Sequence, residues 1–595
     1  MRRIPSEIEV QRIPSEIDVR RLQGESEIEI MIQKLKTMNW ENWIAGIATI
    51  FRVWFGSFLG QWLLALSTHD DALLVKYADF SFHYVDHGVL PQQALVKESM
   101  FPLFLNLVHV SGLGYATVVS LLWVVTALCV CRTLRLLTDN RRFLLFAYIF
   151  VLFTPCAFEV WLGTRIYRNG IIAPFVFITF SLYLYMFFLY LKKTDVSIKK
   201  YISNWCILGL VTFFTAYIKE DGAWLLASML AVVFACICVS VQKKSMKMAL
   251  LVLLPVVVYF GALNIYKAVN DKYFGIYETN TRTNGELAEF VNNIYKIDAE
   301  GRTESVWAPA DAIEKAYAVS ETFQSYPEMH EHMVNTAWRN GSIVENPILG
   351  DFLTWIARDA VYDSGLWESE AKVAEIFGRI NDEIELAFED GRLKEDPKFR
   401  LVASTGGRTK EELYKLPEYM KDLYLTVFRL HGYIPGGAIQ EEFDAEVTGI
   451  ASEYCNANLS PLIGAGKQAE AKRVNSANKI VGAIFFIYKW LHPILCLISL
   501  VGFIMTMVYL FTSFKKKEKF PWTTFWVFMV MIGLILLSLV YSLCICWFAS
   551  FIMSARWLSY YSSGLIALVG LIELIGVYLF DFTLRYFVHK QKAKL

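Results

Sequence analysis

Two adjacent carboxylates, Asp70 and Asp71, stand in the stretch STHDDALLV and follow an almost wholly apolar run over 44–67. A carboxylate at the mouth of a membrane cavity can remove a proton from an attacking hydroxyl, and a second can bind a cation or position a substrate. The alternative is a solvated polar end of a membrane helix. We favour catalysis and predict that either Asp70 or Asp71 is the general base.

Basic residues that could bind a phosphate occur in three other stretches. Arg165 and Arg168, in GTRIYRNG, are three residues apart and would share one face of a helix. Arginine suits bidentate phosphate binding, although interfacial arginines also extend toward lipid headgroups. Arg556 stands beside aromatic residues in SARWLSYY, and Lys97 lies in the loop after the first apolar run. We predict that these four side chains bind the phosphate group of a substrate.

Other carboxylates are candidates to line the same cavity, namely Glu98, Glu220 and Asp221. No metal site is predicted, but whichever of Asp70 and Asp71 is not the base is a candidate ligand for a divalent cation such as Mg²⁺ or Mn²⁺. His83 and His87, four residues apart, form a weaker metal candidate. The sequence has no phosphate-binding Walker motif and no G-x-S-x-G motif.

The composition predicts that a membrane positions these residues. The chain of 595 residues is 55% hydrophobic and 15% aromatic, and its mean hydropathy is +0.38. These values indicate a polytopic membrane protein in contact with membrane lipids. The formal net charge of +0 gives no support for a nucleic-acid partner.

A membrane-spanning helix needs about 20 apolar residues. About ten stretches satisfy this requirement, and we therefore expect an all-α polytopic membrane protein. The expected spans are 44–67, 113–137, 142–160, 171–191, 202–218, 222–241, 248–268, 491–511, 523–548 and 558–582.

Basic residues follow every even-numbered span, for example Arg132 and Arg135 after the second and Lys515 after the eighth. By the positive-inside rule, both termini are then cytoplasmic. The candidate residues and a large acidic region fall on the opposite, extracytoplasmic face. We expect an integral protein of a bacterial plasma membrane.

The chain divides into four parts by charge and apolarity. These are a cytoplasmic extension (1–43), a membrane domain of seven spans (44–268), an acidic extracytoplasmic domain (269–478) and a membrane domain of three spans with a basic tail (479–595). The acidic region holds 36 Asp and Glu against 21 Lys and Arg. Its hydrophobic periodicity over 368–390 predicts an amphipathic helix, so we expect the domain to be α-rich.

Two local patterns predict further structure. Thr409-x-x-Glu412 fits a capping box. The external loop 69–100 carries an apolar stripe that predicts an amphipathic helix on the membrane surface. The stripe consists of Leu73, Leu74, Tyr77, Phe80 and Tyr84.

An acidic Asp-Asp loop after the first span, followed by many spans and an external domain, resembles the C-type glycosyltransferases. The chain is more closely similar to a set of large, uncharacterised bacterial membrane proteins. The matching stretches are DDALLVKYA, VKESMFPLFL, RIYRNGI, KEDGAWLL and GDFLTWIARDAVYDSGLWESEAKVAEIFGRINDEIELAFEDGRL. Where that set has Gly-Pro after the lysine at position 97, this chain has Glu98-Ser99.

The resemblance implies a polytopic transferase that uses a polyprenyl-phosphate-linked sugar, with a catalytic aspartate in the first external loop. The acceptor would be an extracytoplasmic molecule such as a cell-surface glycan, and the role would be polysaccharide biosynthesis for the cell envelope. Two alternatives remain open. One is a transporter or flippase of a lipid-linked glycan, and the other is a non-enzymatic membrane scaffold or receptor.

Overall fold

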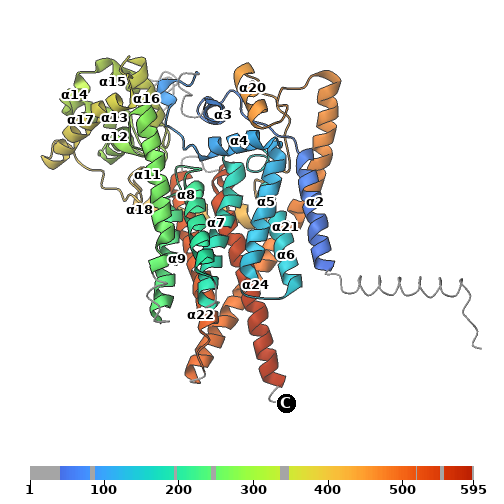
Figure 1. Cartoon of the computed structure of the whole chain (residues 1–595). Helices are drawn as coiled ribbons and strands as arrows, with labels where there is room; N and C mark the ends of the chain where they lie inside the picture. Colours follow the sequence, from blue (N-terminus) through green and yellow to red (C-terminus); the bar gives the residue numbers. More distant parts are fainter. Residues whose placement is uncertain are drawn as a thin grey trace, which may run out of the picture.

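The computed structural model describes residues 40–80, 88–192, 197–242, 250–335, 348–516, 519–549 and 555–592. Within these ranges the protein is helical, and extended segments pair only through isolated bridges. Figure 1 shows a bundle of long helices with a smaller helical domain beside one of its ends.

Seven helical segments are long and apolar enough to cross a membrane, so the expectation of an integral membrane protein is supported. They are Tyr115–Leu134 (α5), Arg141–Phe158 (α6, Arg141–Leu152, with the 3-10 turn η3, Pro155–Phe158), Asn169–Lys192 (α7), Ala223–Val241 within α9 (Ala223–Gln242), Gly464–Lys515 (α21), Trp522–Ala549 (α22) and Ser563–Gln591 within α24 (Ser563–Lys592). The count of ten is not confirmed. The other three expected spans overlap helices that do not combine length and apolarity to the same degree, namely α2 (Trp40–Phe58), α8 (Ile198–Ala216) and α11 (Leu254–Phe274).

The expected first span, 44–67, is wrong at its C-terminal end, because α2 ends at Phe58. The chain is irregular from there to Asp71, and side chains bond its backbone groups. Gln440 accepts a hydrogen bond from the Leu63 N–H at 2.9 Å and donates one to the Leu63 carbonyl at 3.1 Å. Buried backbone groups need such partners once the helix has ended.

The bundle is closed by its longest helices, and α21 and α24 pack against each other along much of their length. Between them, the buried His492 contacts the carboxylate of Glu573 at 3.0 Å. Nearly every residue of α7 is buried, which places that helix at the centre of the bundle. At the end of the bundle opposite the smaller domain, one cavity brings together the basic residues Lys192, Lys519 and Arg585.

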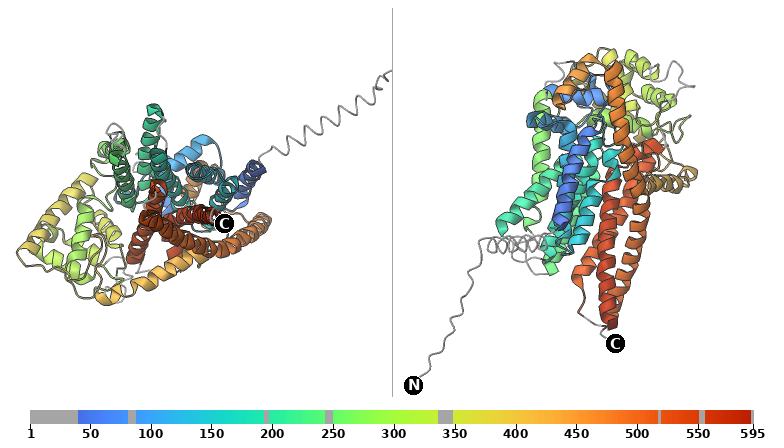
Figure 2. Two further views of the ribbon diagram at one scale, coloured as in Figure 1. Left: turned by 90° about the horizontal axis from the view of Figure 1, so that it is seen from below. Right: turned by 90° about the vertical axis from the view of Figure 1, so that its right-hand side faces the viewer.

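The smaller domain (Figures 1 and 2), called the side domain below, is a separate group of helices. It has its own apolar core between Leu287 and Leu393. Its helices are α12 (Gly285–Lys296), α13 (Ala310–Val319), α14 (Glu321–Gln324), α15 (Pro327–Val334), α16 (Leu353–Asp363) and α17 (Glu370–Glu389). The predicted amphipathic helix over 368–390 is confirmed as α17, with Val373, Phe377 and Ile380 buried. Continuous helices, α11 and α21, cross the predicted limits of the acidic domain at 269 and 478.

Seven further short helices complete the described part of the fold. They are α3 (Asp71–Phe80), η2 (Pro91–Gln93), α4 (Met100–Ser111), α18 (Lys410–Leu413), α19 (Leu416–Arg429), α20 (Ala445–Tyr454) and α23 (Ala555–Tyr561). Figure 1 places α3, α4 and α20 at the same end of the bundle as the side domain. The capping box predicted at Thr409 and Glu412 is confirmed at the start of α18.

The predicted membrane-surface helix is corrected. Leu73, Leu74 and Tyr77 of α3 are at most 2% exposed, because α4, α20 and Trp355 of the side domain enclose them. These three residues of the apolar stripe therefore contact protein rather than lipid, and the side chain of Phe80 is outside the described part of the structure. Tyr84, together with His83 and His87, lies outside the described residues.

Candidate functional site

Asp71 is a fully buried carboxylate at the first position of α3. Arg165 binds it with two hydrogen bonds, from Nε to Oδ2 at 2.9 Å and from an Nη atom to Oδ1 at 2.5 Å. The backbone N–H of Leu64 donates a third at 2.8 Å. Burial raises the pKa of the Asp71 carboxyl, and Arg165 opposes that shift. Two parallel hydrogen bonds of this kind are typical of an ionised arginine–carboxylate pair, and here Arg165 and Asp71 are both buried.

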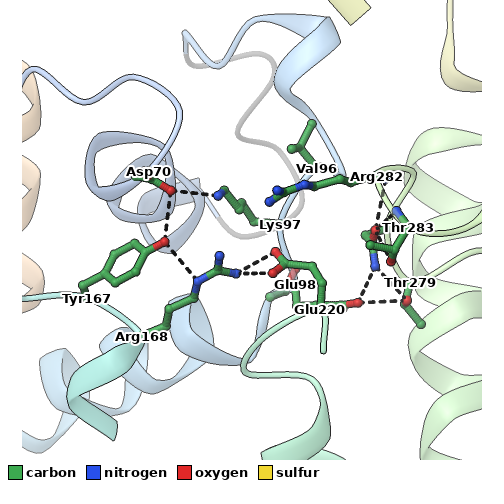
Figure 3. Close-up of polar contacts among 12 residues, drawn as sticks. Asp70, Val96, Lys97, Glu98, Tyr167, Arg168, Glu220, Thr279, Arg282 and Thr283 are labelled. Carbon is green, nitrogen blue, oxygen red and sulfur yellow. Dashed lines mark hydrogen bonds and ion pairs between the residues drawn. The ribbon is translucent and has the colours of Figure 1, made fainter. Parts of the chain in front are cut away.

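Asp70, the preceding residue, has a different environment. Its Oδ1 accepts hydrogen bonds from Lys97 Nζ at 2.9 Å and from the Tyr167 hydroxyl at 3.0 Å (Figure 3). The Asp70 side chain is 41% exposed. Burial raises the pKa of Asp70, but the opposing attraction of Lys97, with smaller contributions from Arg168 and Arg165, lowers it well below its usual range. Asp70 is therefore an ionised carboxylate that solvent can reach.

Lys97 and Arg168 extend the charged network on either side of Asp70. Burial lowers the pKa of Lys97 to about 8, and the neighbouring Asp70 partly offsets that shift. Arg168 donates to both carboxylate oxygens of Glu220 at 2.6 Å and to the Tyr167 hydroxyl at 3.1 Å (Figure 3). Burial raises the pKa of Glu220, but Arg168 and Lys97 bring it down to about 2. The Arg168–Glu220 pair is thus ionised at neutral pH.

Glu98 is 2% exposed and is held by neutral groups instead of a cation. It accepts hydrogen bonds from Tyr266 and Asn280, and from Thr279 (Figure 3). Burial, together with the charge on Glu220, raises the pKa of Glu98 to about 8. Glu98 therefore holds a proton at neutral pH.

The side domain and the segment before it supply further groups. Arg282 pairs with Asp351 and lies over the Trp355 ring, with its guanidinium carbon 5.6 Å from the ring centroid. Lys97 Nζ lies 5.3 Å from the centroid of the same ring. The indole of Trp355 therefore lies beside two cations of the candidate site.

Arg358, in α16, fixes the loop that carries Lys97. Its fully buried guanidinium donates to the carbonyls of Gln92 and Ala94, at 2.5 and 2.8 Å, and to Glu370 at 2.9 Å. Between this clamp and Lys97, Leu95 adopts a left-handed conformation with φ of 53°. That conformation costs a non-glycine residue about 1 kcal/mol, so contacts with the side domain help to hold the loop in place.

The structure brings most of the predicted site residues together. Asp70, Asp71, Lys97, Arg165, Arg168 and Glu220 form one network, which with Lys219 and Arg282 we call the charged layer. Glu98 lies at its edge, and Asp221 is exposed in the turn before α9. The Arg556 backbone is in α23, but its side chain is outside the described part of the structure.

Four residues that contact the candidate site were not among the site residues predicted from the sequence. Tyr167 stands between the two predicted arginines in RIYRNG, and Lys219 directly precedes Glu220, so both lay within motifs already singled out. Arg282 and Trp355 come from distant parts of the chain, and no local pattern connects them with Asp70.

In the described ranges, no group of three or more His, Cys, Asp or Glu side chains is placed to hold a metal ion. A divalent cation at the Asp-Asp pair therefore stays a prediction. Comparison with known proteins found no similarity: no family model, curated protein or solved structure matches this chain.

Proposed function

We propose that the protein is a membrane glycosyltransferase that transfers a sugar from a polyprenyl-phosphate donor to an acceptor hydroxyl, with Asp70 as the general base. The observation that carries the proposal is the contrast between the two aspartates. Asp71 is sealed against Arg165, whereas Asp70 is ionised, 41% exposed and surrounded by cations at one end of an apolar helical bundle. The acceptor would be an extracytoplasmic molecule such as a cell-surface glycan.

In the proposed reaction the acceptor oxygen attacks the anomeric carbon of the donor sugar. The bond from that carbon to the phosphate oxygen breaks, the glycosidic bond forms, and Asp70 takes the hydroxyl proton. Polyprenyl phosphate leaves with the bonding electrons, and neighbouring cations stabilise its charge. The basic end of the bundle, around Lys192 and Lys519, would face the cytoplasm.

Lys97 would couple donor binding to the strength of the base. In the described structure the positive charge of Lys97 stabilises the ionised carboxylate of Asp70. This lowers the pKa of Asp70 and makes it a weak base. A donor phosphate would compete for Lys97. Loss of the Lys97 contact would raise the pKa of Asp70 toward its usual value, so the carboxylate would become more basic only when the donor is bound.

The test is sugar transfer in proteoliposomes supplied with a panel of radiolabelled polyprenyl-phosphate sugars and a cell-envelope glycan fraction. Release of polyprenyl phosphate and labelling of the glycan are both measured. We expect Asp70→Asn to lower the rate by at least about a hundredfold, because general-base catalysis contributes that much. Asp390→Asn, on the exposed surface of the side domain, is the matched control and should retain full activity. Activity that survives Asp70→Asn, or no turnover of any donor, would contradict the proposal.

Transport of a lipid-linked glycan is the second candidate, and the buried His492–Glu573 pair between two membrane-spanning helices favours it. Ionisable residues inside a membrane bundle often mark transport pathways. Transport predicts that Glu573→Gln stops the movement of a fluorescent lipid-linked sugar across the bilayer, whereas Asp70→Asn does not. A scaffold or receptor predicts neither transfer nor transport.

A further inference from the structure

The charged layer has more cations than carboxylate partners. Four of its cations each pair with a carboxylate within 3.0 Å, and these pairs are Lys97–Asp70, Arg165–Asp71, Arg168–Glu220 and Arg282–Asp351. Lys219 is the fifth cation. Among the described residues, no carboxylate lies within ion-pair distance of its ammonium group.

Lys219 is nevertheless buried, with 7% of the residue exposed. Its Nζ lies 5.8 Å from the ring centroids of both Tyr560 and Tyr561, on the side of the layer formed by α23. Burial lowers the pKa of Lys219, and the nearby Asp221 opposes that shift without reaching ion-pair distance. Asp221 and Glu220 are near enough to attract Lys219 but form no ion pair with it. A buried cation without a directly bonded carboxylate is costly, so the site favours binding of an anion.

Two stacked tyrosines separate Lys219 from Asp70. The rings of Tyr167 and Tyr560 are 6.0 Å apart and inclined by 28°. Tyr167 donates its hydroxyl hydrogen bond to Asp70, and Tyr560 faces Lys219. An anion at Lys219 would therefore lie across the tyrosine pair from the proposed base.

We infer that Lys219 is the principal ligand of the substrate phosphate, a role that the sequence had suggested for three arginines and Lys97. Arg165 and Arg168 are each paired with a carboxylate that is at most 11% exposed, and binding a phosphate would require them to release it. Lys219 can accept a phosphate without breaking an ion pair. The inference rests on the proposed function for the identity of the substrate, a lipid-linked phosphate.

The test is binding of polyprenyl phosphate to the purified full-length protein in nanodiscs, with phosphatidylglycerol and inorganic diphosphate as separate arms. We expect Lys219→Met to weaken polyprenyl phosphate binding by at least about tenfold, the loss typical of one charge-assisted hydrogen bond. Lys219→Arg should bind within a few-fold of the wild type. The matched control is Lys296→Met in the side domain, where the lysine is paired with Glu395, and it should bind normally.

Thermal unfolding provides a readout that separates binding from structure. Removing an unpaired buried charge should leave the melting temperature of Lys219→Met unchanged or raised, whereas Arg168→Met should lower it because Glu220 is left unpaired. Normal polyprenyl phosphate binding by Lys219→Met, or a fall in melting temperature equal to that of Arg168→Met, would overturn the inference. Equal losses in the phosphatidylglycerol and polyprenyl arms would support the phosphate site and identify it as a general lipid-phosphate site.

The two proposals fail in different ways. If the wild type transfers sugar but Lys219→Met binds the donor normally, the inference about Lys219 is wrong and the transferase proposal stands. If no sugar is transferred but polyprenyl phosphate binding depends on Lys219, the transferase proposal is wrong and the phosphate site stands.

Discussion

The charged layer contains two neighbouring aspartate–cation pairs, which we call its inner half (Asp71 with Arg165) and its outer half (Asp70 with Lys97). The two aspartates differ in their access to solvent. On the inner side, Asp71 and Arg165 are both almost completely buried and are joined by two hydrogen bonds. On the outer side, Asp70 is 41% exposed and is joined to Lys97 by one. Adjacent residues of one type thus differ in solvent access and in the number of bonds to their cation.

This difference separates a structural role from a chemical one. Breaking a buried bidentate pair leaves an uncompensated charge in a medium of low dielectric constant, so such a pair holds segments together. In the outer pair Lys97 is buried, but Asp70 reaches solvent and the two are joined by a single contact, so Asp70 can exchange its partner for a substrate at smaller cost. The outer half of the layer is therefore where we expect chemistry, and the inner half fixes α3 to the segment before α7.

The largest expected effect is on the inner half. Asp71→Asn should lower the free energy of unfolding by about 3–5 kcal/mol, because Arg165 would remain buried without its counter-charge. Thermal unfolding in detergent, followed by size-exclusion chromatography, measures the loss. Asp70→Asn is the matched control, and a loss as large as that of Asp71→Asn would remove the distinction between the two halves.

A third carboxylate, Glu98, sharpens the comparison because neutral donors hold it. Its pKa is raised from 4.5 to about 8, so the folded protein keeps a proton that the unfolded chain releases between those values. Stability from this site should fall as the pH rises from about 4.5 to 8. Glu98→Gln resembles the protonated acid and does not titrate.

We therefore compare the free energy of unfolding of Glu98→Gln with that of the wild type at pH 5 and at pH 8. The difference should be about 1–3 kcal/mol more favourable to Glu98→Gln at pH 8 than at pH 5. Melting temperatures at the two pH values measure the difference. Glu278→Gln, at a partly exposed ion pair with Lys267, is the control. A constant difference between Glu98→Gln and the wild type across this range would show that Glu98 is ionised in the folded protein.

The smallest effect on stability is expected on the outer half. Lys97→Met should change the free energy of unfolding by under about 1 kcal/mol, because Asp70 keeps solvent contact and its hydrogen bond from Tyr167. The same variant should raise the pKa of Asp70, which the pH dependence of sugar transfer would report as a shift to higher pH. A melting temperature as low as that of Asp71→Asn would place Lys97 among the structural residues.

The local sequence predicted individual elements well where one pattern dominates. The period of apolar residues located α17, and Thr409-x-x-Glu412 located the start of α18. It was less reliable where apolar residues contact protein instead of lipid. The stripe on α3 looks like a membrane-surface pattern, but Trp355, almost 300 residues further along the chain, covers part of it. The end of α2 at Phe58 was missed for a similar reason, since Gln440 bonds the backbone that follows.

By itself, the sequence determined that the protein is an apolar helical membrane protein, and it singled out Asp70, Asp71, Arg165 and Arg168 as residues of interest. Helical periodicity and apolar length are local properties, so no folded structure is needed to read them. Only the tertiary structure decided which aspartate is sealed and which is exposed, and that Lys219 is buried without a paired carboxylate. The physical reason is that burial and charge pairing depend on segments that meet only after folding, here α3, the turns before α7 and α9, and the side domain.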